Sequence, residues 1–222
     1  MTSQYFAAPR DFEGETAVCI ASGPSLSDAD VRYVRDMKAL GKCRVFVCNN
    51  NYLKVPEADV LFFCDKNFWV WHCLKPEFQA FKGTKITLST EIGEPDIKVM
   101  QLGMTTGLSF LQSVLRTGGN SGYMQVNLAF LYGCKRVILL GYEMQTKVIE
   151  RDNGEKSVLS HWFGEHPAQA TSAEHQAFYN SCLDNFPTMI PDLDAHGLEV
   201  INCSTPSAIN CFPKLPLREA LK

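Results

Sequence analysis

Two histidines stand in a segment whose composition differs from the rest of the chain. Residues 145–170 are rich in charge, contain glycines, and include His161 and His166. Imidazole exchanges protons near neutral pH, so a histidine in such a segment is suited to accept the proton of a hydroxyl group. We therefore predict that residues 145–170 form a lid loop over a site, with His166 as its base. The alternative for His166 is an ordinary histidine on a surface loop.

A second feature suited to chemistry is a polar turn that leads into an apolar run. Asn120, Ser121 and Gly122 precede the apolar residues 123–132. This pattern predicts a helix whose first turn presents unpaired backbone N–H groups, together with the side chains of Asn120 and Ser121. Such a helix end is suited to bind a phosphate group.

A comparable turn occurs near the start of the chain. Gly23, Pro24 and Ser25 follow the short apolar run 17–21 and precede a second amphipathic segment. Two turns of this kind in one chain suggest a nucleotide held between them. Taken alone, the glycine and proline also fit an ordinary turn between a strand and a helix.

Polar residues also follow several of the other predicted strands. In a parallel sheet the carboxyl ends of the strands share one edge, which is where such sheets bind ligands. Asn49 to Asn51 can alternatively form a local turn through their side chains. A phenol such as that of Tyr142 can act as a neutral hydrogen-bond donor to a departing phosphate. The residues at the strand ends are Asn49, Asn50, Asp65, Gly141, Tyr142 and Glu143.

Apolar runs alternate with amphipathic segments along most of the chain. Continuous rather than alternating hydrophobicity favours strands that are covered on both faces. We predict one α/β domain over residues 1–222, with a Rossmann-like, mostly parallel sheet, helices on both faces and the lid at 145–170. The expected strands are 17–21, 44–48, 60–64, 85–89, 97–102, 135–141 and 199–203, and the expected helices are 27–40, 67–78, 120–133 and 171–196, the last interrupted by prolines.

Composition narrows the class of partner. The 222 residues carry a net charge of −3, and 45% of them are hydrophobic. This balance predicts a packed core and no bulk binding of nucleic acid. The nine cysteines are spaced more widely than zinc ligands usually are, so we expect buried free thiols and no metal site. Residues 1–10 lack an apolar core and no apolar run is long enough to span a membrane, so we expect a cytoplasmic protein.

Six motifs in chain order give the sequence a resemblance to known proteins. Together they resemble the bacterial sialyltransferases of the Campylobacter type, glycosyltransferase family 42, and the related DUF115 group. That group includes archaeal 6-hydroxymethylpterin diphosphokinases and Maf-type flagellin glycosyltransferases. The motifs are Gly23-Pro24-Ser25-Leu26, Asn49-Asn50, Asn120-Ser121-Gly122-Tyr123-Met124, Gly141-Tyr142-Glu143-Met144, Ser160-His161-Trp162-Phe163-Gly164-Glu165-His166 and Asn202-Cys203-Ser204-Thr205-Pro206-Ser207.

The resemblance implies roles for these residues. The first turn and the asparagine strand end would line a CMP-sugar site, the Asn120 segment would lie at the cytidine monophosphate, and the Gly141 segment would lie near the cytidine. The family's catalytic histidine matches His166 best, with His161 as the alternate. Two positions depart from the family pattern, because Trp162 replaces a tyrosine and Gly118 replaces an arginine.

These observations predict a metal-independent glycosyltransferase that uses a nucleotide-activated sugar, such as a CMP-sugar, and a hydroxyl-bearing acceptor. No further cofactor is expected, and a homo-oligomer is compatible with the sequence. One alternative is a diphosphokinase that uses ATP, with Mg²⁺ held by Asp65 and Glu143. Another is a nucleotide-binding protein without catalytic activity.

Overall fold

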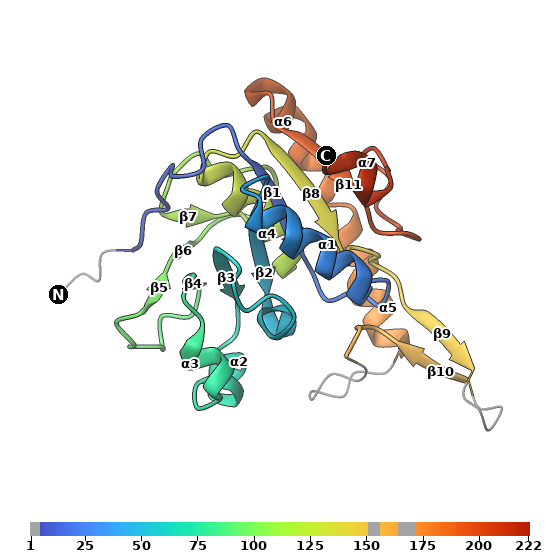
Figure 1. Ribbon diagram of the computed structural model, residues 1–222, viewed down its shortest axis with the longest axis horizontal. Helices are drawn as coiled ribbons and strands as arrows, with labels where there is room; N and C mark the ends of the chain where they lie inside the picture. The colour runs from blue at the N-terminus through green and yellow to red at the C-terminus, as the bar shows by residue number, and fades with distance from the viewer. Residues whose placement is uncertain (1–4, 151–155, 164–171) are drawn as a thin grey trace.

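The centre of the molecule is a seven-stranded sheet in which every strand pair is parallel. A computed structural model describes residues 5–150, 156–163 and 172–222 (Figure 1). The strand order is β11-β8-β1-β2-β3-β4-β5. These strands are β1 Thr16–Ile20, β2 Arg44–Cys48, β3 Val60–Phe63, β4 Thr84–Thr87, β5 Ile97–Val99, β8 Arg136–Leu140 and β11 Glu199–Asn202.

The order of the strands reverses at β1. The chain continues from β1 to β2 on one side and returns to place β8 on the other side, so β1 pairs with both. Connections that diverge from one strand leave a crevice beyond its carboxyl end, and α/β proteins bind ligands there. The predicted Rossmann-like α/β fold is confirmed, and its topology points to the carboxyl ends of β1 and β8.

Helices cover both faces of this sheet, as the sequence predicted. Successive strand residues point to opposite faces, and in β1 Cys19 joins one apolar cluster while Ile20 joins the other. Helices α4 and α6 contribute to the first cluster, and α1, α2, α3 and α7 to the second. Their bounds are α1 Asp28–Ala39, α2 Lys66–His72, α3 Pro76–Ala80, α4 Ser121–Leu131, α6 Ile190–His196 and α7 Leu217–Ala220.

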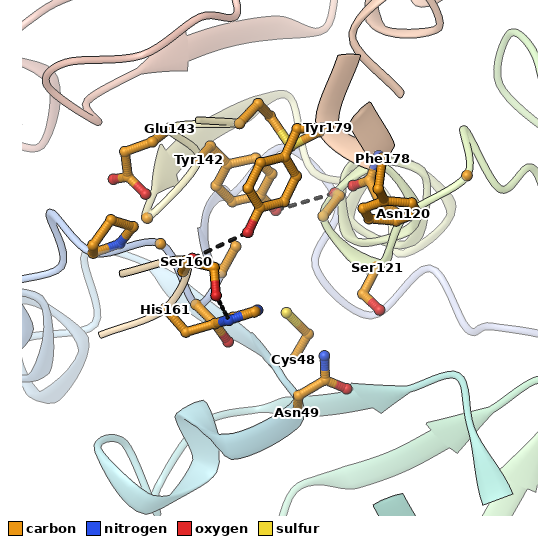
Figure 2. Close-up of a pocket in the computed structure, with 18 of the residues that line it drawn as sticks. Cys48, Asn49, Asn120, Ser121, Tyr142, Glu143, Ser160, His161, Phe178 and Tyr179 are labelled. Atoms are coloured by element: carbon orange, nitrogen blue, oxygen red, sulfur yellow. Dashed lines mark hydrogen bonds between the residues drawn. The ribbon is translucent and has the colours of Figure 1, made fainter. Parts of the chain in front are cut away.

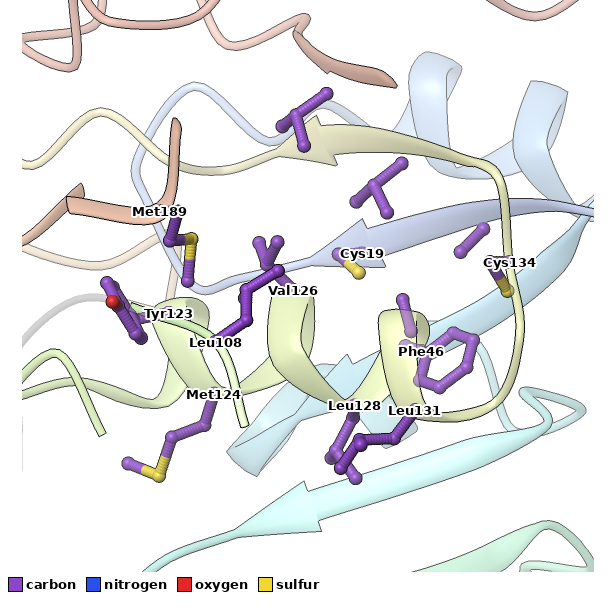
Figure 3. Close-up of a cluster of buried hydrophobic side chains, with 14 of the residues drawn as sticks. Cys19, Phe46, Leu108, Tyr123, Met124, Val126, Leu128, Leu131, Cys134 and Met189 are labelled. Carbon is purple, nitrogen blue, oxygen red and sulfur yellow. The ribbon is translucent and has the colours of Figure 1, made fainter. Parts of the chain in front are cut away.

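Helix α4 packs directly on the sheet and is buried along almost its whole length. Figure 3 shows its side chains Val126 and Leu128 in the cluster that also contains Cys19 and Phe46 from β1 and β2. A helix that is apolar on all sides belongs in the interior of a protein. This burial fixes the position of the α4 amino end relative to the sheet.

Several elements differ from the expectation. The single helix predicted at 67–78 is two helices, α2 and α3, because Pro76 disfavours a helical Lys75 and begins a new helix. The strand predicted at 97–102 is divided into β5 and β6 Gln101–Leu102, and β6 pairs with the unpredicted β7 Val114–Leu115. The 3-10 helix η1, Asn49–Leu53, follows β2 directly.

The segment predicted as a lid loop contains regular structure. Strands β9 Lys147–Glu150 and β10 Lys156–Leu159 pair antiparallel and extend away from the main sheet (Figure 1). The last predicted helix is divided, as its prolines suggested, into α5 Ser172–Leu183, the 3-10 helix η2 Phe186–Met189, and α6. Within the described ranges, no helix has the length and apolarity needed to cross a bilayer.

Candidate functional site

A cavity of about 490 Å³ opens at the carboxyl ends of the central strands (Figure 2). Segments that are far apart in the sequence form its wall, including the ends of β1, β2, β3, β8 and β10, the amino end of α4, and helix α5. The lining residues are Ala21, Ser22, Gly23, Pro24, Cys48, Asn49, Cys64, Asp65, Gly119, Asn120, Ser121, Gly122, Met124, Gly141, Tyr142, Glu143, Met144, Gln145, Ser160, His161, Phe178 and Tyr179.

The turn after β1 and the turn after β8 are in close contact. The Gly23 N–H group donates to the Gly141 carbonyl at 2.9 Å. A Cβ atom at Gly23 would overlap Glu143 Oε2 and lie 2.5 Å from the same Gly141 carbonyl oxygen. The contact therefore requires glycine at position 23.

Glu143 carries a buried carboxyl group beside the cavity. Its side chain accepts a hydrogen bond from the Ser25 hydroxyl through Oε1, and only 2% of the residue is exposed. Among the described residues, Oε2 has no hydrogen-bond partner. Burial raises the pKa of Glu143 above its ordinary value, although the Ser25 hydrogen bond acts in the opposite direction. The site thus holds a buried carboxyl group whose Oε2 atom packs against the Gly23 turn.

The amino end of α4 forms another side of the cavity. Asn120 caps the helix, because its Oδ1 accepts from the Tyr123 N–H group at 2.9 Å. The first-turn N–H groups of Ser121 and Gly122 have no partner within the helix, which gives this wall donors for an anion. Gly122 lets the Tyr142 ring approach, since a Cβ atom there would lie 2.7 Å from that ring.

The arginine of the resembled family has no room in this chain. Its position is Gly118, whose φ of 51° falls in the left-handed region. A Cβ atom at Gly118 would overlap the Tyr123 ring. Within the described ranges, no Lys or Arg lines the cavity. The described walls therefore offer a phosphate neutral hydrogen-bond donors.

Tyr142 lines the cavity, but its hydroxyl group points into the protein. The hydroxyl donates to Gln125 Oε1 at 2.7 Å, with the Gly122 carbonyl oxygen at 3.1 Å. Gln125 is fully buried and donates in turn to the Phe46 carbonyl at 3.0 Å. Burial raises the pKa of Tyr142 well above its ordinary value. The phenol thus joins α4 to the end of β8.

Asn51 links three separate parts of the site, and it was not among the predicted binding residues. Its Nδ2 group donates to the carbonyls of Ile20 and Cys48 and to Ser22 Oγ, at 3.1, 2.9 and 3.1 Å. Its Oδ1 accepts from Trp162 Nε1 at 2.7 Å. The residue is fully buried. The neighbouring Asn49 has a φ of 50°, which is uncommon for a residue with a side chain.

His161 reaches the cavity from the end of β10. The Ser160 hydroxyl lies 2.8 Å from His161 Nδ1, and the Ser160 carbonyl accepts from the Tyr179 hydroxyl at 3.1 Å. The imidazole also stacks on Phe163, with ring centroids 4.9 Å apart. Figure 2 shows Ser160 and His161 between Glu143 on one side and the Asn120–Ser121 helix end on the other.

Tyr179 presents a second phenol to the cavity, and Phe178 lies beside it. Burial, followed by the charge of Glu143, raises the pKa of Tyr179 to about 12. The phenol is therefore protonated at neutral pH, and it donates its proton to the Ser160 carbonyl. Sequence reasoning did not single out this adjacent aromatic pair, because nothing in the helical pattern of 171–196 distinguishes a cavity face from a packing face.

Most of the predicted site residues meet at this cavity. Ser25 does not line it but contacts it through Glu143, and Asn50 lines a neighbouring cavity. His166 lies outside the described residues. No group of three or more potential metal ligands occurs in the described part of the chain. The predicted residues that line the main cavity are Gly23, Pro24, Asn49, Asp65, Asn120, Ser121, Gly122, Gly141, Tyr142, Glu143 and His161.

No protein-family model matches the chain. No curated protein matches it either. Two solved structures share its fold. A Maf glycosyltransferase from Magnetospirillum magneticum AMB-1 aligns with a TM-score of 0.61 and 12% identity over 98% of this chain, which spans only 36% of that protein. The sialyltransferase CstII from Campylobacter jejuni, in complex with the substrate analogue cytidine-5′-monophosphate, aligns with a TM-score of 0.53 and 13% identity over 92% of this chain and 86% of CstII. The chain therefore has a sialyltransferase- and Maf-like fold.

Proposed function

We propose that the chain is a metal-independent glycosyltransferase that moves a sugar from a nucleotide donor, of the CMP-sugar kind, to a hydroxyl group. The convergence of three segments on one cavity carries the proposal. The turn after β1, the amino end of α4 and the histidine at the end of β10 all line it. Residues 1–222 would then act as one nucleotide-sugar-binding domain. The likeness in fold to two glycosyltransferases supports the same reading.

The cavity offers separate surroundings for the phosphate and the base of a nucleotide. A phosphate at the α4 amino end would accept from first-turn N–H groups and the Ser121 hydroxyl. The base would then lie toward Glu143, as the resemblance implies for the Gly141–Glu143 strand end.

His161 is our proposed base. In the tautomer with a proton on Nδ1, that nitrogen donates to Ser160 Oγ, and Nε2 carries the lone pair that takes the acceptor's proton. The acceptor oxygen forms a bond to the anomeric carbon while the bond from that carbon to the phosphate oxygen breaks. The nucleotide leaves with the bonding electrons. The α4 N–H groups and the Ser121 hydroxyl would stabilise its phosphate, and Tyr142 would position the α4 amino end through its hydrogen bond to the Gly122 carbonyl.

The proposal has a direct binding test. The melting temperature of the purified protein is measured in the presence of CMP, CDP, UDP, GDP or ATP, with either EDTA or Mg²⁺ added. We expect CMP to raise the melting temperature most and EDTA to leave that rise unchanged. A response limited to ATP with Mg²⁺ would instead support the diphosphokinase alternative. If no nucleotide raises the melting temperature, the proposal is wrong.

Turnover measurements on variants distinguish His161 from His166 as the catalytic base. CMP-sugar consumption is measured for His161→Ala, His166→Ala and the exposed control His196→Ala. We expect a loss of about 100-fold or more in kcat for His161→Ala, with the CMP-induced melting shift retained. If only His166→Ala shows this loss in kcat, His166 rather than His161 is the base. Retained nucleotide binding without turnover in the wild type would favour a binding protein.

The thiols agree with a reducing compartment such as the cytoplasm. All nine cysteines are free. Burial raises the pKa of four of them, Cys43, Cys48, Cys134 and Cys203, to about 12. Such thiols are poor nucleophiles and act as small apolar side chains.

A further inference from the structure

Trp162 follows the proposed base directly, and it is one of the two positions at which the chain departs from the resembled family pattern. Its side chain lines neither the main cavity nor the neighbouring one. The residue is half-buried and packs against the apolar cluster to which α1 and α2 contribute. Because Trp162 lines no cavity, any effect it has on the site passes through its neighbours.

We propose that Trp162 is a positioning residue, which holds His161 at a fixed place relative to the turn after β1. That turn lines the main cavity, where the donor is proposed to bind, through Ser22, Gly23 and Pro24. The inference rests on the proposed function and adds how the site sets the distance between its base and its donor.

Trp162 is attached to the turn after β1 through its backbone and through its side chain. Its backbone N–H group donates to the Ser22 carbonyl at 3.0 Å, and its Nε1 group donates to Asn51 Oδ1 at 2.7 Å. Asn51 is itself fixed, because its Nδ2 group donates to Ser22 Oγ and to the Ile20 carbonyl. Since Nδ2 is engaged in this way, Oδ1 faces the indole, and the contact needs a hydrogen-bond donor at position 162.

Lys54 contacts the face of the same indole. Its Nζ atom lies 4.2 Å from the centroid of the Trp162 ring. The Lys54 side chain is only 17% exposed, and it is paired with Asp28 at the start of α1. A largely buried cation interacts with an indole face more strongly than an exposed one does. The hydrogen bond at the edge of the ring and the cation on its face together hold the indole in one orientation.

His161 lies between two anchored residues. On the side away from Trp162, the Ser160 carbonyl accepts from the Tyr179 hydroxyl at 3.1 Å. Phe163 stacks on the imidazole and meets the Trp162 ring edge-on, with ring centroids 5.3 Å apart in the second pair. A base must lie within hydrogen-bond reach of the proton it accepts, so a shift of about 1 Å can cost about 100-fold in rate. Loss of the indole should therefore lower turnover without removing a contact to the donor.

The test separates positioning from packing with two pairs of variants. Trp162→Ala removes the ring, whereas Trp162→Phe keeps a ring for Lys54 and removes the Nε1–H donor. Trp69→Ala and Trp69→Phe are the matched controls, because Trp69 is also half-buried, packs against the same cluster and lines neither cavity. For each protein, kcat and KM for the CMP-sugar are measured together with the CMP-induced melting shift. Hydrogen exchange of the Trp162 indole N–H in the wild type is followed by NMR, through the signal that Trp162→Phe lacks.

We expect kcat to fall about 10–100-fold in Trp162→Ala and by a smaller factor in Trp162→Phe, with KM within about two-fold of wild type. The CMP melting shift should persist in both variants. Both Trp69 variants should keep the wild-type kcat. The Trp162 indole N–H should exchange slowly with solvent, because it is bonded to a buried acceptor.

Four results would each overturn the inference: wild-type kcat in Trp162→Ala, an equal loss of kcat in the Trp69 variants, a rapidly exchanging Trp162 indole N–H, or loss of the CMP melting shift together with kcat. If Trp162→Ala does not fold, Trp162→Phe decides by the same criteria. A wild type that neither responds to a nucleotide nor turns over a CMP-sugar marks a failure of the proposed function itself, and the inference then fails with it.

Discussion

The Glu143 carboxyl group occupies the space that a side chain would need at Gly23. Its Oε2 atom faces the Gly23 Cα position, and the Ser25 hydroxyl of the same turn donates to its Oε1 atom. The turn after β1 and the segment after β8, more than a hundred residues apart in the sequence, thus pack closely against each other. This packing explains why glycine stands at position 23 and glutamate at position 143, without reference to a ligand.

Gly23→Ala should destabilise the protein by about 1–3 kcal/mol, because the new methyl group would overlap Glu143 and the Gly141 carbonyl. Gly93→Ala is the matched control, since a Cβ atom there meets no other atom within 4 Å. Urea unfolding of both variants measures the difference. Equal stabilities would contradict the fit between the Gly23 turn and Glu143.

Glu143→Gln should change how stability depends on pH. Burial raises the pKa of Glu143 above its ordinary value of 4.5, so the folded state binds this proton more tightly than the unfolded state. The resulting stabilisation is complete below the ordinary value and is lost as pH rises through the raised one. The free energy of unfolding of Glu143→Gln, relative to wild type, should therefore increase from pH 4.5 to pH 8. A difference that stays flat over this interval would show that the carboxyl group is not perturbed.

Asn51→Ala should cost about 2–4 kcal/mol, because it removes the hydrogen bonds by which this buried amide joins the Ile20 and Cys48 carbonyls and the Trp162 indole. Asn50→Ala, one residue away and partly exposed, should change stability by less than about 0.5 kcal/mol. Chemical denaturation with tryptophan emission as the signal compares the two. A similar loss in both variants would argue against the special position of Asn51.

Acid should weaken the protein through His72. Burial lowers the pKa of this imidazole to about 4, and its Nδ1 atom lies 2.7 Å from the Tyr52 hydroxyl. The unfolded state takes up a proton near the ordinary value of 6.5, so the contribution of His72 is present above that pH and is lost as pH falls toward 4. We expect a loss of about 2–3 kcal/mol between pH 7.5 and pH 4.

His72→Gln should remove that part of the pH dependence, whereas His196→Gln, at an exposed position, should retain it. Urea midpoints of the wild type and both variants at several pH values provide the measurement. An unchanged acid slope in His72→Gln would assign the loss to other groups.

The central strands were predictable because each is a continuous apolar run that ends in polar residues, as at Val60–Phe63 before Asp65. The helix expected from residue 27 begins there, because Ser27 caps α1 by accepting from the Asp30 N–H group. Short strands such as β7 and β9 were missed, since two to four partly exposed residues carry little periodic signal.

Within the site, the sequence indicated which segments meet but not which side chains turn inward. Of three consecutive asparagines, only Asn51 is fully buried, and that choice depends on the 3-10 turn after β2. Tyr142 follows a strand as predicted, yet its hydroxyl is directed inward by Gln125 on α4. Both outcomes depend on contacts between residues distant in sequence, which local patterns do not encode.

The four hydrogen-bond contacts of Asn51 bear on how this pocket could be moved to another scaffold. Copying the Gly23–Ser25 turn alone would transfer a loop without the amide that fixes its direction. The smallest transferable unit also includes the end of β2 and the indole of Trp162, because Asn51 bonds to both. A designer who grafts this pocket should therefore treat three discontinuous peptides as one part.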